Sequence, residues 1–242
     1  MNLDYASDAR SAAFEKDHWW VRSRFGLIDR ALKQLGPRAP LAILEVGCGT
    51  GINLDYIETR CGDRLTRLVG IDPEAVPARS RTREVRHDIP PEEFFDLILA
   101  MDVLEHVDDP VELLTRLHGH LKSSGRLLLS VPAFPWLWTA YDRLAHHRKR
   151  YTLRELVSEL QAAHFVVEER FFLFGLLFPF FVIQRLALKW RPHDDARLFK
   201  PTGPWLNRLL YALTSFEMRA GMPYNRWFGS SAVAIARRAE PA

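Results

Sequence analysis

The sequence predicts an α/β fold with a seven-stranded, mostly parallel sheet and helices on both of its faces. One observation is the apolar run over residues 41–46, which leads directly into three glycines at every second position, Gly47, Gly49 and Gly51. A short apolar run followed by closely spaced glycines is typical of a buried strand, a tight turn and the start of a helix. The other observation is that further apolar runs alternate with segments of helical periodicity. That order indicates parallel strands joined by right-handed crossover helices.

Length and composition fit one large domain with an insertion, because 242 residues can bury a full core. The net charge of +3 suits an anionic membrane surface or a phosphorylated substrate, and it is too small to indicate nucleic acid as a partner. Of the two cysteines, Cys48 lies inside the glycine turn, where a disulfide would obstruct a ligand. Because no apolar signal-peptide run is found near the N-terminus, we expect a reducing, cytoplasmic compartment.

The glycine turn predicts a nucleotide site, because the helix that follows it offers unpaired N–H groups and glycine lets a ligand approach the backbone closely. The spacing is G-x-G-x-G and not the G-x-G-x-x-G of dinucleotide-binding folds. The next apolar run, 68–71, ends in Asp72, and an acid at that place can hold ribose hydroxyls. The spacing therefore argues against a nicotinamide or nucleotide-sugar oxidoreductase, and so does the lack of a Tyr-x-x-x-Lys pair.

Glu45 to Gly51 together with Asp72 resemble the first motif and the ribose-binding acid of the class I S-adenosylmethionine-dependent methyltransferases, in particular a group of small-molecule, ubiquinone-biosynthesis-like enzymes. The resemblance covers roughly residues 41–173 and 229–238. It implies a Rossmann-like fold and S-adenosylmethionine as the cofactor, with Asp88 at the adenine ring and Met101 and Asp102 near the methionine portion. The residues that it implies for cofactor binding are Glu45, Gly47, Cys48, Gly49, Gly51, Asp72, Asp88, Met101 and Asp102.

The first forty residues carry a helical apolar spacing that runs from Phe14 to Leu35 and stops at Gly36 and Pro37. The paired Trp19 and Trp20 resemble the N-terminal caps that fold over cofactor and substrate in this superfamily, and packing of the helix on the core explains them as well. We expect three parts: a helical cap (1–40), a methyltransferase core (41–173 with 229–242) and a helical hairpin (174–228) inserted into the core before its last strand.

Within the core, the elements follow in alternating order. A helix is expected from Gly51 to about Arg60, and a short helix led by Pro73 and Glu74 before the third strand. Asp109 and Thr152 each precede a Glu three residues later, which predicts two N-capped helices with apolar stripes. The expected strands beyond the second cover residues 84–86, 94–101, 126–131, 165–172 and 231–236.

The segment 133–151 has no regular period but is rich in aromatic and basic residues, and it must lie beyond the carboxyl ends of the strands, where ligands bind in open α/β sheets. We expect it to form the acceptor pocket, with His146 or His147 as the general base if the acceptor is a hydroxyl. For Lys149 and Arg150 we favour a solvated basic loop. The residues expected to bind substrate are His106, Trp136, Trp138, Tyr141, Arg148 and Tyr151.

The insertion begins with an uncharged run over residues 173–183 that is too short to cross a bilayer, which takes roughly 18 apolar residues. A second helix, 205–220, has an apolar stripe. The two read either as a hairpin packed over the substrate side or as a peripheral membrane contact through 174–190, bordered by Lys189, Arg191 and Arg197. The second reading would place the protein at the inner face of the membrane.

The sequence therefore predicts an S-adenosylmethionine-dependent methyltransferase acting on a small amphiphilic acceptor, with O-methylation favoured. The alternative is a non-catalytic S-adenosylmethionine-binding partner or regulatory module. No metal-ligand spacing is present, since His118 and His120 lie two apart on an expected helix, where side chains diverge. The oligomeric state has no signal in the sequence.

Overall fold

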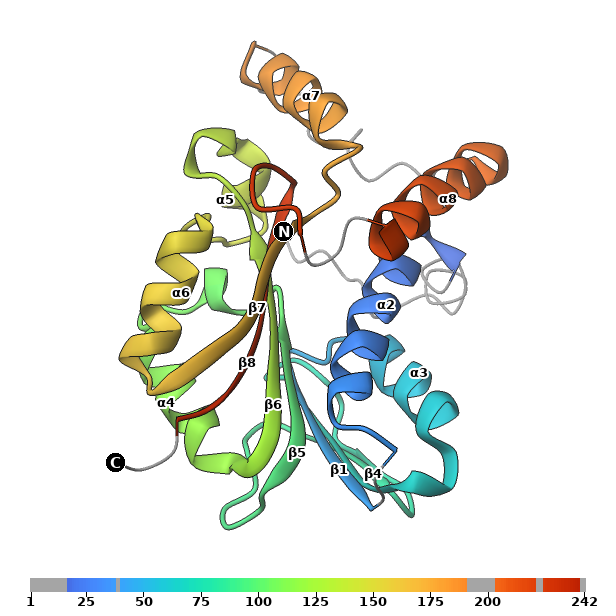
Figure 1. Cartoon of the computed structure of the whole chain (residues 1–242), viewed down its shortest axis with the longest axis vertical. Coiled ribbons are helices and arrows are strands. Elements are labelled where there is room, and N and C mark those ends of the chain that lie inside the picture. Colours follow the sequence, from blue (N-terminus) through green and yellow to red (C-terminus); the bar gives the residue numbers. More distant parts are fainter. Residues whose placement is uncertain (1–16, 38–39, 191–202, 221–223, 240–242) are drawn as a thin grey trace.

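The computed structural model of the chain describes residues 17–37, 40–190, 203–220 and 224–239. In this part of the chain, eight strands form one sheet in the order β3-β4-β2-β1-β5-β6-β8-β7 (Figure 1). The strands β4, β2, β1, β5 and β6 run parallel, whereas β3, β8 and β7 join the sheet by antiparallel pairing. The predicted fold class is confirmed. The strands are β1 (Leu41–Val46), β2 (Leu65–Ile71), β3 (Ala78–Arg79), β4 (Arg83–Arg86), β5 (Phe95–Met101), β6 (Leu121–Pro132), β7 (Phe165–Leu173) and β8 (Ser231–Arg238).

The extra strand, β3, corrects the prediction of a short helix led by Pro73 and Glu74. Pro73 and Pro77 stand four residues apart, so that the segment lacks two backbone donors and cannot build a helical ladder. The chain turns after Asp72 and returns as a two-residue edge strand paired with β4. The sheet therefore has eight strands where seven were expected.

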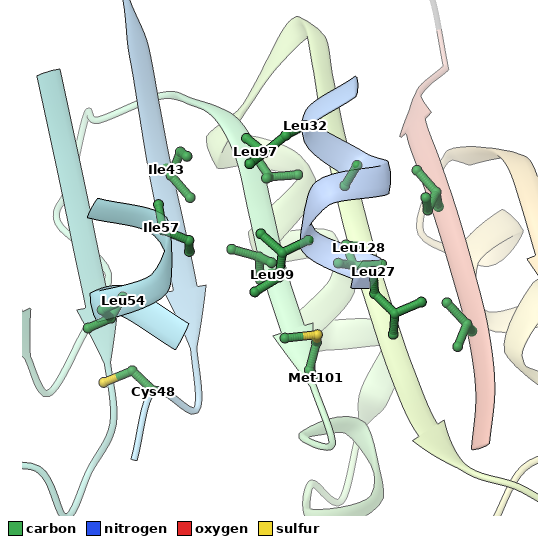
Figure 2. Close-up of a cluster of buried hydrophobic side chains, with 14 of the residues drawn as sticks. Leu27, Leu32, Ile43, Cys48, Leu54, Ile57, Leu97, Leu99, Met101 and Leu128 are labelled. Atoms are coloured by element: carbon green, nitrogen blue, oxygen red, sulfur yellow. The ribbon is translucent and has the colours of Figure 1, made fainter. Parts of the chain in front are cut away.

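Helices cover both faces of the sheet, as predicted. Figure 2 shows one face, where Leu27 of α2 and Ile57 of α3 pack against β1, β5 and β6. On the other face, Leu117 of α4 and Leu156 of α6 lie in a second buried cluster. Both predicted helix caps form, with Asp109 accepting from the Glu112 N–H at 2.9 Å and Thr152 forming a capping box with Glu155. The core helices are α2 (Trp19–Gln34), α3 (Ile52–Cys61), α4 (Pro110–His120), α5 (Ala140–Leu144) and α6 (Leu153–Ala162), with 3-10 turns η1 (Gly62–Arg64), η2 (Leu104–His106) and η3 (Pro135–Leu137).

The insertion contains two helices, α7 (Phe178–Trp190) and α8 (Pro204–Ala220), which point apart and do not form the expected hairpin (Figure 1). The helix α8 packs along α2, and α7 lies beside η3. Phe14 and the flanking Arg191 and Arg197 lie outside the described residues, as does the side chain of Lys189. The structure contains no described helix of the length and apolarity that a bilayer span requires.

The face of α8 that meets α2 is mixed, since Leu210, Tyr211 and Met218 pack against the core beside polar side chains. Three of its polar side chains form hydrogen bonds with the core, whereas most of the predicted apolar stripe, Leu206, Leu209, Leu213 and Phe216, lies on the solvent side. The three contacts are Asn207 with the Trp19 N–H at 2.8 Å, Thr214 with the Ser23 hydroxyl at 2.7 Å and Glu217 with the Gly175 N–H at 2.7 Å.

Glu45, near the end of β1, is a buried carboxyl group in the middle of the sheet. Its Oε1 accepts a hydrogen bond from Asn53 of α3 at 2.6 Å, and its Oε2 has no hydrogen-bond partner. Burial raises the pKa of Glu45 to about 7, although the Asn53 hydrogen bond and the charge of Arg24 act in the opposite direction. This residue therefore ties the first strand to the first crossover helix at an electrostatic penalty that depends on pH.

We expect the pH dependence of stability to show this penalty in the protein without cofactor. Glu45 stays protonated in the folded chain up to about pH 7 and ionises in the unfolded chain near 4.5. Its contribution is thus fully present below pH 4.5 and is lost as the pH rises through 7, a change of about 3 kcal/mol at most. Glu45→Gln, compared with wild type by urea unfolding at pH 5 and pH 8, should gain stability at pH 8 relative to pH 5. A difference between the two proteins that is the same at both pH values would contradict the assignment.

Candidate functional site

The glycine turn lies where β1 ends, at the carboxyl edge of the parallel strands. The N–H groups of Gly47 and Cys48 both donate to the Ile71 carbonyl at the end of β2, at 2.7 and 3.1 Å. Gly47 has a φ of +72°, and a Cβ on it would lie 2.6 Å from Cγ2 of Val103. A side chain here would both strain the backbone and collide with the segment after β5. The turn is therefore pressed against the ends of β2 and β5, where a ligand would lie.

Asp72 fixes the turn from the next strand. Its Oδ2 accepts from the Gly49 N–H at 2.8 Å, and its Oδ1 accepts from the Glu74 N–H at 2.9 Å. Each carboxylate oxygen can accept more than one hydrogen bond, so both oxygens keep capacity for hydroxyl groups of a ligand. The predicted ribose-binding acid thus stands directly beside the glycine turn.

The last glycine of the turn, Gly51, lies under a cation. A Cβ on Gly51 would come within 2.3 Å of Nη2 of Arg83, whose Nη1 pairs with Asp55 in the first turn of α3 at 2.6 Å. Cys48 is buried in the same turn, and burial together with the charge of Glu45 raises the pKa of its thiol to about 12. Its role here is packing, because the reactive thiolate form is suppressed.

Arg24 of α2 closes the end of β5. It donates to the Met101 carbonyl at 3.0 Å and pairs with the Asp102 carboxylate at 3.2 Å, while its guanidinium lies 4.5 Å from the ring of Trp20. Asp102 has a φ of +58°, and its Oδ1 accepts from Ser130 at 3.1 Å. The sequence analysis missed Arg24, since nothing local to it signals a partner about eighty positions away.

Asp88 follows β4 and is the most open of the expected cofactor residues, with 77% of its side chain exposed. It accepts from the Ile89 N–H at 2.8 Å and pairs with Arg116 of α4 at 2.9 Å. The backbone hydrogen bond from Ile89 holds its pKa below the ordinary value of an aspartate, although burial opposes this. Asp88 stays on the same edge of the sheet as the glycine turn, just beyond the end of β4, which pairs with β2.

In the segment after β6, a fully buried aspartate, Asp142, organises the polar groups. Its Oδ1 accepts from His147 Nδ1 at 3.0 Å and from Arg150 Nε at 2.7 Å. Its Oδ2 accepts from Nη1 of Arg185, in α7, at 2.9 Å. Burial would raise the pKa of Asp142, but the hydrogen bond from His147 and the charges of both arginines hold it well below its usual range. The aspartate is thus ionised, and His147 must be the donor in their hydrogen bond.

Glu105 and the two histidines beside it form a second cluster. The rings of His106 and His147 meet edge to face at 4.9 Å, and Glu105 is buried with no hydrogen-bond partner for either carboxylate oxygen. One ligand atom from each of the three lies within 4.8 Å of the others, so they could hold a metal ion. Burial and the charge of Asp102 raise the pKa of Glu105 well above its usual range, and a cation would have to displace that proton. Sequence spacing gave no sign of this set, because its members come from two distant segments.

The other residues expected at the acceptor pocket are distributed unevenly. Trp136, Trp138 and Tyr141 stay at or near the surface, and Tyr141 lies edge to face with His147 at 6.3 Å. Arg148 is exposed, donates to the His106 carbonyl at 3.0 Å and pairs with Asp108 at 2.6 Å.

Three residues of this segment depart from expectation. Tyr151 is fully buried, with its hydroxyl donating to the Leu104 carbonyl at 3.2 Å, so it belongs to the core and does not line a pocket. Arg150 is buried against Asp142 and is not part of a solvated loop. His146 is exposed and has a φ of +57°, which separates it from its neighbour His147.

A separate hollow of about 260 Å³ lies between the ends of α2 and α3, lined by residues that include Asp29, Lys33 and Arg60. It is at the amino edge of the parallel strands, and its Asp29 is already paired with Arg60 at 2.7 Å. Ligands of open α/β sheets bind at the opposite edge, and we therefore place the site at the glycine turn.

Comparison with known proteins agrees with this geometry. Residues 20–170 match the model of a methyltransferase domain family. Ubiquinone biosynthesis O-methyltransferase of Rhodopseudomonas palustris is 31% identical in an alignment of 196 positions that covers 69% of this chain and 72% of that relative. tRNA U34 carboxymethyltransferase of Shewanella baltica is 31% identical in an alignment of 116 positions that covers 42% of this chain and 34% of that relative.

Among solved structures, a Haloferax volcanii protein in complex with the Trm112 methyltransferase activator has a TM-score of 0.57 at 17% identity, covering 97% of this chain and 95% of that one. This likeness concerns the fold. The family match extends over more than half of the chain and includes the glycine turn, Asp72 and the end of β5. The chain belongs to the methyltransferase domain family and is an S-adenosylmethionine-dependent methyltransferase.

Proposed function

We propose that the chain transfers the methyl group of S-adenosylmethionine to a hydroxyl of a small amphiphilic acceptor, and that His147 takes the proton of that hydroxyl. The observation that carries the proposal is the hydrogen bond of 3.0 Å between His147 Nδ1 and the buried, ionised Asp142. Because the carboxylate only accepts, the neutral imidazole keeps its lone pair on Nε2, the atom that a general base uses. The name of the relative from Rhodopseudomonas palustris, an O-methyltransferase, supports a hydroxyl as the acceptor.

The chemistry needs little else from the protein. The bound cofactor supplies a methyl group on a sulfonium, which an oxygen nucleophile displaces in line as the carbon–sulfur bond breaks. The chain positions the acceptor and excludes water, and His147 accepts the hydroxyl proton. His106, which is exposed and meets the same imidazole edge to face at 4.9 Å, is the neighbouring residue that we expect to contact the acceptor.

We assign the cofactor to the carboxyl edge of the sheet. The turn from Glu45 to Gly51 faces the methionine portion and its link to the ribose. Asp72 contacts the ribose and Asp88 the adenine, and Met101 and Asp102 lie at the methionine portion. The support is that the ends of β1, β2, β4 and β5 bring these segments to one edge. Arg24 adds a cation that fixes Asp102 and the Met101 carbonyl.

We also propose that the protein attaches to a lipid surface. Of the six large apolar residues at the start of the insertion, Leu176, Phe180 and Ile183 are exposed, Leu177 is buried and Phe178 and Phe181 are half-buried. The apolar stripe of α8 is also turned outward apart from the half-buried Leu210, and large exposed apolar patches mark binding surfaces. The exposed large apolar residues of α8 and of residues 224–228 are Trp205, Leu206, Leu209, Leu213, Phe216, Tyr224, Trp227 and Phe228.

The charges on this surface favour an anionic membrane. The charged side chains exposed on the described part of α8 and on residues 224–228 are Arg208, Arg219 and Arg226, and the acid of the segment, Glu217, faces inward. Tryptophan and tyrosine are enriched at membrane interfaces, and each large side chain moved into lipid contributes about 1.5 to 3 kcal/mol. An amphiphilic acceptor would be reached from the same surface.

Asp72→Ala should weaken S-adenosylmethionine binding at least tenfold, because charge-assisted hydrogen bonds contribute about 1.5 to 3 kcal/mol each. Calorimetry measures the affinity, and Asp72→Asn tests whether the shape of the side chain suffices without its charge. Asp63→Ala, an exposed acid at the other edge of the sheet, is the matched control and should bind like wild type. Wild-type affinity in Asp72→Ala would place the ribose elsewhere.

His147→Ala should lower turnover by about 10² to 10⁴, with little change in cofactor affinity. An alkylated catechol, 4-dodecylcatechol, serves as the probe acceptor, and release of S-adenosylhomocysteine is measured. The turnover of His146→Ala should stay near that of wild type. The His146 imidazole is exposed, and in the described part of the chain it is His147 whose ring is hydrogen-bonded to Asp142. Full turnover in His147→Ala would remove the proposed base.

Wild type should float with vesicles that contain phosphatidylglycerol, and a Phe180→Asp, Ile183→Asp double variant should stay in the aqueous fraction while still binding cofactor. These two side chains are 61% and 68% exposed, so that the substitutions leave the core intact. Val76→Asp introduces the same charge at an apolar residue that is exposed elsewhere, and it should float. A wild type that remains aqueous and elutes as a dimer would identify the surface as an interface between copies.

A further inference from the structure

Arg185 reaches from α7 into the segment that carries the proposed base. Its Nη1 donates to Oδ2 of Asp142 at 2.9 Å and to the Thr139 hydroxyl at 2.6 Å. Its guanidinium carbon also lies 4.9 Å from the centre of the Tyr141 ring. One side chain of the insertion thus makes two hydrogen bonds and a ring contact in a segment more than forty positions earlier in the chain.

The two oxygens of Asp142 have different partners. Oδ1 accepts from His147 at 3.0 Å and from Arg150 at 2.7 Å, whereas Oδ2 accepts from the Thr139 N–H at 2.9 Å and from Arg185. A carboxylate is planar, so the donors that hold Oδ2 also fix the direction in which Oδ1 faces the imidazole. Without Arg185, Oδ2 would keep only Thr139, whose N–H donates at 2.9 Å and whose hydroxyl donates at 3.3 Å, so the carboxylate would be held less firmly against rotation about its bond to Cβ.

Charge balance does not require Arg185. Arg150, which is buried and also donates to the Ala133 carbonyl at 2.9 Å, already neutralises Asp142. Burial and the like charge of Arg150 lower the pKa of Arg185, which shows that the second guanidinium is held against an electrostatic penalty. A buried charge of this kind is weak support for stability. With charge balance and stability set aside, the effect of Arg185 that remains is to fix the orientation of the Asp142 carboxylate.

We propose that Arg185 is a positioning residue for the methyl transfer: through Asp142 it holds the His147 imidazole in its reactive orientation, which makes α7 a structural part of the acceptor site. The inference rests on the proposed role of His147 as the base. It adds a residue that touches neither cofactor nor acceptor and that lies in an element outside the methyltransferase core.

Loss of Arg185 need not displace the helix, because α7 has its own apolar contacts. The Phe178 ring packs on Phe134 at 5.4 Å and on Trp136 at 6.2 Å, and Phe181 stacks on Trp19 at 6.2 Å. A variant at position 185 therefore reports on the orientation of Asp142 and His147 and leaves the seating of α7 in place.

The test compares Arg185→Met, which keeps the length of the side chain without its donors, with Arg185→Lys. Both hydrogen bonds start from a single nitrogen, so a lysine ammonium should restore part of the function. We expect kcat with 4-dodecylcatechol to fall about 10- to 100-fold in Arg185→Met, with unchanged S-adenosylmethionine affinity, and to recover at least severalfold in Arg185→Lys. Arg143→Met, at an exposed arginine of α5, is the matched control and should behave like wild type.

A second readout does not depend on the acceptor. In wild type, the ¹⁵N resonances of the His147 ring, assigned by their loss in His147→Gln, should show one fixed tautomer with the proton on Nδ1. In Arg185→Met they should move towards the average of the two tautomers. Wild-type kcat and resonances in Arg185→Met would overturn the inference and leave the proposed function standing. Full turnover in His147→Ala would instead remove the proposed base, whatever the spectra of Arg185→Met show.

Discussion

Parallel strands bring their carboxyl ends to one edge, and in this chain that edge collects acids that must be compensated. Glu45, Asp72 and Asp102 stand at or just beyond the ends of β1, β2 and β5. Two features reduce the negative charge at this edge. Burial raises the pKa of Glu45 to about 7, and Arg24 pairs with the Asp102 carboxylate. An acid-rich edge is complementary to a ligand that carries positive charge, as S-adenosylmethionine does on its sulfonium and its amino group. Close packing at the same edge keeps a side chain out of position 47, because a Cβ on Gly47 would lie 2.6 Å from Cγ2 of Val103.

The parts of the structure that sequence reasoning predicted are those specified locally. The turn at Gly47, the strand that ends before Asp72, and the capped helix after Thr152 each depend on residues within about ten positions of one another. Their patterns of apolar spacing, glycine and capping residues act through short-range physics, so they survive when the tertiary context is unknown. The extra strand β3 was not predicted because the apparent helix pattern before it is only a few residues long. Pro73 and Pro77 prevent a helix there.

The polar network of the acceptor segment could not be predicted, because its members are assigned by contacts between distant segments. In sequence, Arg150 looks like part of a basic run. In the structure it is buried, with its Nε 2.7 Å from Oδ1 of Asp142. Tyr151 looks like a pocket aromatic, yet its hydroxyl has a partner inside the core in the Leu104 carbonyl. The type of a residue determines which hydrogen bonds and ion pairs it can form. Which partners lie within reach depends on the fold. For the same reason an apolar stripe on α8 could not reveal that Thr214 and Glu217 would be the residues facing inward.

The orientation of α7 connects the proposed surface attachment with the acceptor site. Successive residues of a helix are turned by about 100°, so Phe180 and Ile183 point about 140° to 160° away from Arg185. Their exposure and the contact of Arg185 with Asp142 agree with that geometry, since one face of α7 meets solvent and the other meets the segment that holds His147. If the proposed function holds, a lipid surface that covers the outer face lies one helix diameter, about 10 Å, from the inner face of α7, which carries Arg185. An amphiphile that keeps its tail in the lipid would have to span this helix and the contact of Arg185 with Asp142 for its hydroxyl to reach His147. The insertion would then serve substrate delivery and base positioning through opposite faces of a single helix.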